Sequence, residues 1–230
     1  MTIVIDRIMA LLKWPVALLS ILALPSLIPL LWSVSLGLVE HLYFVVGLGL
    51  YFFLWRFFFS SRHMGSWFPT LMHELTHGLF AVLTLHQIRS LNATWSEGGE
   101  ITISGGPGNW LITIAPYFVP LTTLSAIVIL GYAEVGHEIR RAVLGFVIGF
   151  EMVCMRRQLH AQQPDLHKVG WVFVWMFLPG AWMWEIGMVL TALNGDSIWA
   201  FTQTMLSNEW QWTQDVISQL WEWVNELVNR

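Results

Sequence analysis

The sequence predicts an all-α, polytopic membrane protein with about six transmembrane helices, a small β-hairpin and a C-terminal amphipathic helix. Of its 230 residues, 56% are hydrophobic and only 11% are charged, whereas a soluble domain carries about 25% charged residues. Several apolar stretches reach the length of about 20 residues that a helix needs to cross a bilayer. Many of the 15 tryptophans stand at the ends of these stretches, where interfacial anchors are found.

Charge and cysteine content exclude several other classes of protein. The net charge is -4 and the basic residues are scattered, so no basic stripe indicates a nucleic-acid partner. Cys154 is the only cysteine, which excludes a disulfide framework and a zinc cluster built from thiolates.

Six apolar stretches are the expected membrane spans. The first follows a short amphipathic lead and contains Pro25 and Pro29, which should kink it. We expect one transmembrane domain over residues 1–193 and a separate interfacial tail over 194–230. The expected spans are residues 14–38, 42–59, 67–85, 110–132, 142–155 and 169–193.

The stretch from residue 87 to 109 has a different character from its neighbours. Residues 88–95 and 100–104 read as short alternating strands, and the glycines at 98 and 99 supply a turn between them. The run Gly-Gly-Pro-Gly at residues 105–108 then ends regular structure. The sequence therefore predicts a hairpin directly after the third apolar stretch.

The tail predicts an amphipathic helix that lies on the membrane surface or packs against a partner. Carboxylates on its polar face disfavour simple adhesion to anionic lipid. We therefore expect contact with membrane lipid and a possible protein partner through this helix. One face carries Ile217, Leu220, Trp221, Val224 and Leu227, and the other carries Asp215, Gln219, Glu222 and Glu226.

The distribution of lysine and arginine predicts the orientation in the membrane. With the N-terminus inside, more of the basic residues between spans fall on the cytoplasmic side than on the opposite side. We therefore expect an integral membrane protein, in the bacterial inner membrane, with both termini cytoplasmic.

The third apolar stretch contains the motif His73-Glu74-Leu75-Thr76-His77. Residues i and i+4 share a helix face, so His73 and His77 can bind one metal ion, with Glu74 placed as the general base. Two imidazoles and a carboxylate are unfavourable in an apolar segment unless they have a function. The alternative is a buried helix with a satisfied His–Glu hydrogen bond.

A catalytic zinc ion normally has three protein ligands, and the motif supplies two of them. Glu151 lies at a depth similar to the two histidines if the third and fifth spans run in the same direction. Asp165 follows Pro164 just before the last apolar stretch and could point into the bundle from there. Each also has an ordinary explanation, because Glu151 could pair within the bundle and Asp165 could cap a helix.

The HELTH motif, the glycine-rich strand region after it and the later Pro164-Asp165 resemble the site-2 protease-like intramembrane zinc metallopeptidases. The resemblance covers roughly residues 69–170. It implies that Asp165 is the third zinc ligand and that Glu74 is the base, although Leu166 stands where the family often has glycine. Six regular spans would put Asp165 on the side opposite the start of the motif helix, unless residues 87–109 re-enter the membrane or 142–155 form a half-span.

The sequence thus predicts an intramembrane zinc endopeptidase that cleaves a transmembrane or membrane-proximal peptide of another membrane protein. Gly99 and Asn109 are the expected substrate-binding residues, and Asn109 could equally cap a helix. Two other classes stay open. One is a non-catalytic scaffold or adaptor subunit that retains a metal site, and the other is a metal or proton transporter.

Overall fold

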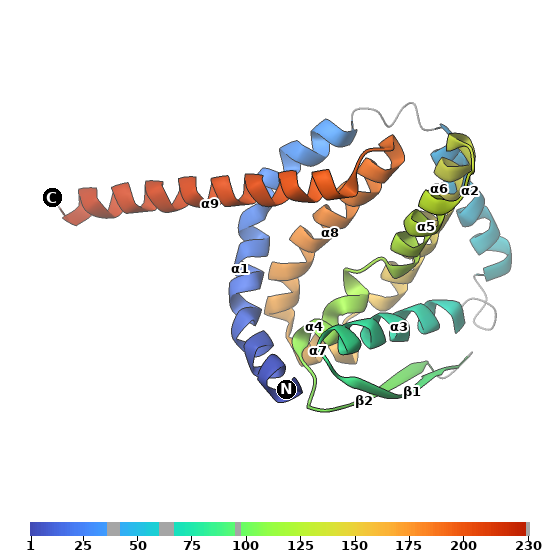
Figure 1. Ribbon diagram of the computed structural model, residues 1–230, viewed down its shortest axis with the longest axis horizontal. Helices are drawn as coiled ribbons and strands as arrows, with labels where there is room; N and C mark the ends of the chain where they lie inside the picture. Colours follow the sequence, from blue (N-terminus) through green and yellow to red (C-terminus); the bar gives the residue numbers. More distant parts are fainter. Residues whose placement is uncertain (36–41, 60–66, 95–97, 229–230) are drawn as a thin grey trace. The chain divides into compact units, whose positions relative to one another are not determined.

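The computed structural model describes residues 1–35, 42–59, 67–94 and 98–228, and it is mostly helical with one two-stranded sheet (Figure 1). The chain forms two compact units. Unit 1 comprises Met1–Pro15 and Val39–Trp175, and unit 2 comprises Val16–Leu38 and Met176–Arg230. The boundary expected at residue 194, between the transmembrane domain and the interfacial tail, stays a prediction.

The helices and strands follow one another along the chain as labelled in Figure 1. Their bounds are α1 Thr2–Ser35, α2 Leu42–Leu54, the π-helical turn η2 Trp55–Phe59, α3 Trp67–Leu83, β1 Gln87–Ala93, β2 Gly99–Ser104, α4 Trp110–Ile114, the 3-10 turn η3 Ala115–Tyr117, α5 Leu121–Tyr132, α6 His137–Gln158, α7 Pro164–Val169, α8 Trp171–Asn194 and α9 Ile198–Val228.

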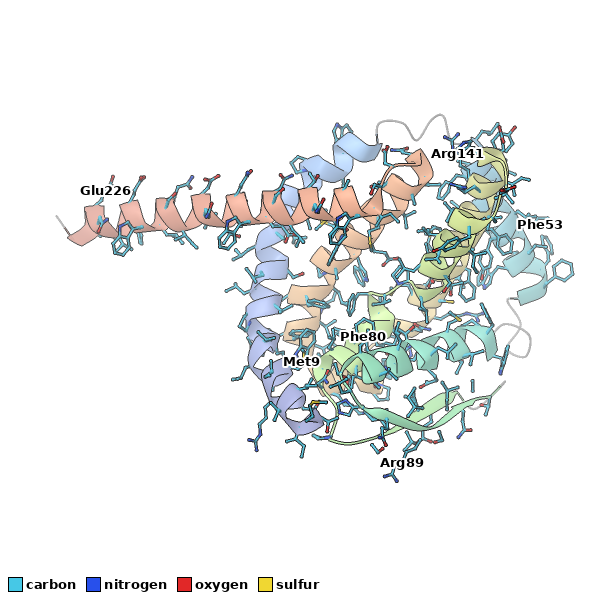
Figure 2. All side chains as sticks on the ribbon, viewed as in Figure 1. Met9, Phe53, Phe80, Arg89, Arg141 and Glu226 are labelled. Carbon is cyan, nitrogen blue, oxygen red and sulfur yellow. The ribbon has the colours of Figure 1, made fainter. Side chains whose placement is uncertain are left out.

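The expected hairpin is confirmed as the antiparallel pair β1–β2, with an irregularity in register between Ile88 and Ser90. Helix α3 lies across one face of this hairpin (Figure 1). Gly78 allows the close approach, since a Cβ atom there would lie 2.9 Å from Cδ1 of Ile101 on β2. Arg89 points away from α3 into the open (Figure 2). The hairpin and α3 therefore form one packed layer that carries the motif.

Helices α2 and α6 pack with their backbones unusually close. A Cβ atom on Gly47 would lie 1.9 Å from the carbonyl oxygen of Ala142, and one on Gly145 would lie 2.0 Å from that of Phe44. Small residues at such contacts are typical of helix pairs in membranes, where close van der Waals packing drives association.

Fewer helices could cross a membrane than the sequence predicts. Among the described residues, Thr2–Pro29 of α1 and Trp171–Asn194 (α8) are long and apolar enough, and a third span exists only if the bent pair Trp110–Tyr117 and Leu121–Tyr132 counts as one. Helix α3 has 17 residues, and α6 carries charges along its 22 residues. The structure supports an integral membrane protein, and the number of six spans stays unconfirmed.

The expected fourth span is broken in the middle. Its two halves, α4 with η3 and then α5, meet at an angle of 71°. Pro116 and Pro120 explain the break, because proline lacks the N–H group that a continuous helix needs. Six regularly alternating spans would have put Asp165 on the side opposite the start of the motif helix. This bend removes that regular alternation.

Unit 2 combines the later part of α1 with most of α8 and with α9. Ser20 on α1 donates a hydrogen bond of 2.7 Å to the carbonyl oxygen of Phe177 on α8. Gly187 on α8 accommodates the ring of Phe201 on α9. The buried core of this unit contains Ala23, Leu27, Phe201 and Met205. The expected tail helix is confirmed, and beyond this core its apolar side chains are exposed.

Candidate metal centre

The motif residues lie on α3, on the side that faces the interior of unit 1. His73, Glu74 and His77 are 9%, 7% and 7% exposed, whereas Leu75 between them is 39% exposed. The helix therefore turns both histidines and Glu74 away from solvent and leaves an apolar residue on the outside. This is the arrangement that the i, i+4 spacing predicts.

Asp165 on α7 lies beside both histidines. Its Oδ2 atom is 3.5 Å from Nε2 of His73 and 3.3 Å from Nε2 of His77, and the two Nε2 atoms are 3.1 Å apart. In the part of the chain that the structure describes, these three residues form the one group with ligand atoms close enough, within 4.8 Å of one another, to hold a metal ion.

The backbone carbonyl of Ile112 fixes the tautomer of His77. A carbonyl oxygen can only accept, so Nδ1 of His77 donates the hydrogen bond of 2.7 Å to it. Nε2 of the neutral ring is then left with a lone pair directed at His73 and Asp165. Two imidazole nitrogens and one carboxylate oxygen form a donor set that fits zinc, with a second partner orienting one of the histidines.

Asp165 is the second residue of α7, directly after Pro164. Proline is well tolerated at the start of a helix, and an acidic residue in the first turn is stabilised by the helix dipole. Burial opposes ionisation of Asp165, but the neighbouring imidazoles of His73 and His77 outweigh this effect and hold the pKa of its carboxyl group below the usual range. The group is therefore a carboxylate at neutral pH, as a metal ligand must be.

Glu74 lies against the start of β2. A Cβ atom on Gly99 would lie 2.6 Å from Cγ and 2.7 Å from Oε1 of Glu74, and 2.7 Å from Cγ2 of Thr70. Only a residue without a side chain fits at this point. The expected contact of Gly99 with a substrate stays a prediction, and in the structure Gly99 sets the room available to Glu74.

A cavity of about 750 Å³ opens beside the three converging residues. Its walls come from α3, from β2, from the loop 105–108 with the start of α4, and from α7. The lining includes His73, Glu74, His77, Gly99, Asn109 and Asp165. The structure thus brings together every residue assigned from the resemblance, along with both expected substrate-binding residues.

Glu151, the alternative third ligand, is engaged elsewhere. Its Oε1 atom accepts hydrogen bonds from the backbone N–H groups of Thr122, at 3.1 Å, and Thr123, at 3.3 Å. These groups belong to the first turn of α5, where no side chain at the N-cap position Pro120 caps the helix. Glu151 on α6 therefore caps the neighbouring helix α5. It does not belong to the group of ligand atoms, although the sequence predicted a similar depth in the membrane for it and for the two histidines.

Asn109 has a structural role that accounts for its side chain. Its Oδ1 atom accepts from the N–H group of Ile112, which caps α4, and its Nδ2 atom donates a bond of 2.9 Å to Oδ1 of Asp6. Oδ2 of Asp6 lies 3.3 Å from Nε2 of His86. This buried group ties the first helix to the loop 105–108 beside the cavity, so the side chain of Asn109 is held by contacts within the fold.

Two further side chains at the centre escaped the sequence analysis. The hydroxyl of Tyr117 is 3.5 Å from Oδ2 of Asp165, and Nζ of Lys168 is 3.8 Å from Oδ1. Lys168, three residues beyond Asp165 on the same short helix, could have been found from spacing. Tyr117 lies 48 residues before Asp165, and nothing in the sequence pattern connects them.

Comparison with known families matches the chain to one of them. The model of the family described as Peptidase M50B-like matches residues 45–193, which is more than half of the chain and includes α3, the hairpin and α7. No curated protein and no solved structure gives a significant match. The matched segment contains all three converging residues and Glu74. The chain belongs to the Peptidase M50B-like family of membrane metallopeptidases.

Proposed function

We propose that this protein is an intramembrane zinc endopeptidase that cleaves a transmembrane or membrane-proximal peptide of another membrane protein. The observation that supports it most directly is the position of Asp165, whose Oδ2 atom lies within 3.5 Å of both motif histidines. His73, His77 and Asp165 would hold the ion. A zinc ion at such a centre polarises a carbonyl group and makes water a stronger acid.

Glu74 is the general base in this proposal. It lies on the cavity wall beside the ligands and is only 7% exposed, so its carboxylate is placed to take a proton from the attacking water. The same carboxyl group then returns that proton to the amine of the cleaved bond. A scaffold that merely retains a metal would need no such base, which is why the cavity and Glu74 together favour an enzyme.

Strand β2 is the proposed docking place for the substrate. The sheet has two strands, so each strand keeps one edge without a strand partner in the described part of the chain. Residues 98–101 and Ile103 of this region line the cavity. A transmembrane helix must unwind before cleavage, because its peptide bonds are otherwise enclosed by hydrogen bonds. An unwound segment could pair with the β2 edge and present its backbone to Glu74.

The test compares wild-type protein with Glu74→Gln in liposomes that contain a fluorescently labelled transmembrane peptide with a Gly-Pro segment to ease unwinding. We expect equal zinc content and loss of cleavage only in Glu74→Gln. Glu138→Gln, which makes the same change at an exposed position on α6, should cleave like wild type. Equal cleavage by Glu74→Gln and wild type would contradict the mechanism, and zinc flux across the liposomes would indicate a transporter.

The proposal also includes an orientation with both termini in the cytoplasm and a location in the bacterial inner membrane. It further includes contacts with lipid and with a protein partner through α9. Protease protection of tags at each terminus, in spheroplasts, would test the orientation.

A further inference from the structure

Tyr117 occupies an unusual position at the break between α4 and α5. It ends the 3-10 turn η3, directly after Pro116, and it is 0% exposed despite its size. A buried tyrosine hydroxyl needs a hydrogen-bond partner. The bend at this point turns the residue toward the metal centre, where that partner is found.

The hydroxyl of Tyr117 reaches the oxygen of Asp165 that also faces the histidines. It points at Oδ2 of Asp165 from 3.5 Å, which is longer than a typical O–H···O hydrogen bond, and the side chain of Gln163 also interacts with this hydroxyl. Because Oδ2 is the carboxylate oxygen that faces both histidines, this contact restrains the rotation of the carboxylate that would bind the metal.

The ring of Tyr117 also contacts the other side of the centre, at His73. The two proposed histidine ligands differ. Nδ1 of His77 is held by the Ile112 carbonyl, whereas Nδ1 of His73 is buried without a hydrogen-bond partner among the residues that the structure describes. The second nitrogen of a metal-binding histidine is normally hydrogen-bonded, and that bond orients the ring. The ring of His73 instead packs edge-on against Tyr117, with centroids 5.4 Å apart and planes at 87°.

We propose that Tyr117 is a positioning residue of the metal centre, a role that rests on the proposed function. Its ring sets the orientation of His73 in place of the absent hydrogen bond, and its hydroxyl sets the orientation of Asp165. One side chain therefore aligns two of the three ligands, while the Ile112 carbonyl aligns the third.

The experiment separates the ring from the hydroxyl. Tyr117→Phe removes only the hydroxyl, and Tyr117→Leu removes the aromatic ring as well. Tyr51→Phe is the matched control, because Tyr51 is also buried, at 6% exposed, but packs between α2 and α6 against Phe146. Each purified protein is measured for zinc affinity by chelator competition, for the absorption spectrum of its cobalt-substituted form, and for cleavage of the labelled peptide.

We expect zinc affinity to fall about 10-fold in Tyr117→Phe and up to about 100-fold in Tyr117→Leu, the range typical of partners that orient metal ligands. The cobalt spectrum should change in both variants and stay unchanged in Tyr51→Phe. Wild-type affinity and spectrum in Tyr117→Phe and Tyr117→Leu would overturn the inference. It would also be overturned if the two variants only lowered the melting temperature of the metal-free protein. If Tyr117→Leu does not fold, the spectrum of the nearly isosteric Tyr117→Phe decides. A wild-type protein that binds no zinc would overturn the proposed function first, and this inference with it.

Discussion

Gly99 and Glu74 are in such close contact that a single methyl group on Gly99 would lie 2.7 Å from Oε1 of the glutamate. Real Cβ atoms do not approach other atoms so closely. The contact links the hairpin, which we propose binds the substrate, to the proposed general base. The position of the base therefore depends on the strand as well as on its own helix.

Gly99→Ala should reduce cleavage strongly while zinc content stays near wild type. The added Cβ pushes the Glu74 carboxylate or the start of β2 aside, and a shift of about 1 Å can lower a rate by about 100-fold. None of the three proposed ligands would contact the added Cβ at the closest distances. The measurement is kcat on the labelled peptide together with zinc per protein.

Gly131→Ala on α5 is the control for this prediction, because a Cβ atom there meets nothing within 4 Å. It should leave cleavage unchanged. Alanine also has a higher helix propensity than glycine by about 1 kcal/mol, so the variant should be no less stable than wild type. Wild-type cleavage by Gly99→Ala would mean that the contact with Glu74 relaxes without effect.

Asp165→Ala should mainly lower zinc affinity, whereas Glu151→Ala should mainly lower stability. Loss of Asp165 removes a proposed ligand, so zinc affinity should fall by more than the roughly 100-fold that loss of an orienting partner can cause. Loss of Glu151 removes the cap of α5, so we expect about 1 kcal/mol of lost stability and nearly unchanged zinc affinity. Chelator competition and thermal unfolding measure the two effects. An empty centre in Glu151→Ala with zinc retained in Asp165→Ala would reverse the assignment.

The two acids show how the two sequence arguments for the third ligand differ, and the identity of that ligand stays a prediction. The motif face of α3 and the strands β1 and β2 follow from local spacing, so both could be predicted. The argument from depth favoured Glu151 because it assumed regular spans, and the 71° bend at Pro116 and Pro120 makes that assumption invalid. The resemblance pointed to Asp165 because a short motif near a helix start does not depend on counting spans.

Other parts of the centre could not be predicted, for a physical reason. Any residue has a carbonyl group, so the partner of His77 on α4 carries no signal in the sequence. Tyr117 comes to the centre only through the bend between α4 and α5. Asp6 reads as part of an amphipathic lead, yet it is 8% exposed and bound to His86 and Asn109. Each of these contacts depends on tertiary structure that no local pattern encodes.

Asp6→Ala should destabilise the protein and, through the loop 105–108, reduce cleavage. The change leaves Nδ2 of Asn109 and Nε2 of His86 without their partner, and each buried polar group without a partner costs about 1–3 kcal/mol. Thermal unfolding in detergent measures the stability, and Asp215→Ala, at an exposed position on α9, is the control. An unfolding midpoint equal to that of the control would show that water replaces Asp6 without loss.

Truncation of α9 before Ser207 should leave zinc binding intact and change what the protein associates with. The cut preserves Phe201 and Met205, the two α9 residues in the core of unit 2. The part removed carries exposed apolar side chains, among them Trp210, Leu220 and Trp221 at 64%, 56% and 66% exposure. Each such side chain contributes roughly 1.5–3 kcal/mol when it becomes fully buried, so the helix face is expected to be covered in the assembled protein. Figure 2 shows the side chains of α9 along its length, with Glu226 labelled near its end.

The charge of α9 indicates which kind of surface binds its exposed face. Between residues 207 and 228 there is no lysine or arginine, and the four acidic residues are Glu209, Asp215, Glu222 and Glu226. An anionic membrane surface attracts basic segments and repels acidic ones, so a protein surface with basic groups is the expected partner. The truncated protein should therefore keep its zinc content but lose co-purifying partners, change in oligomer size, or cleave its natural substrate in cells at a different rate. A variant with all four acids changed to their amides should reproduce these changes if charge guides the contact. If the truncated and full-length proteins agree in partners, size and cellular cleavage, the helix is a passive element of the membrane surface and the expectation of a protein partner is wrong.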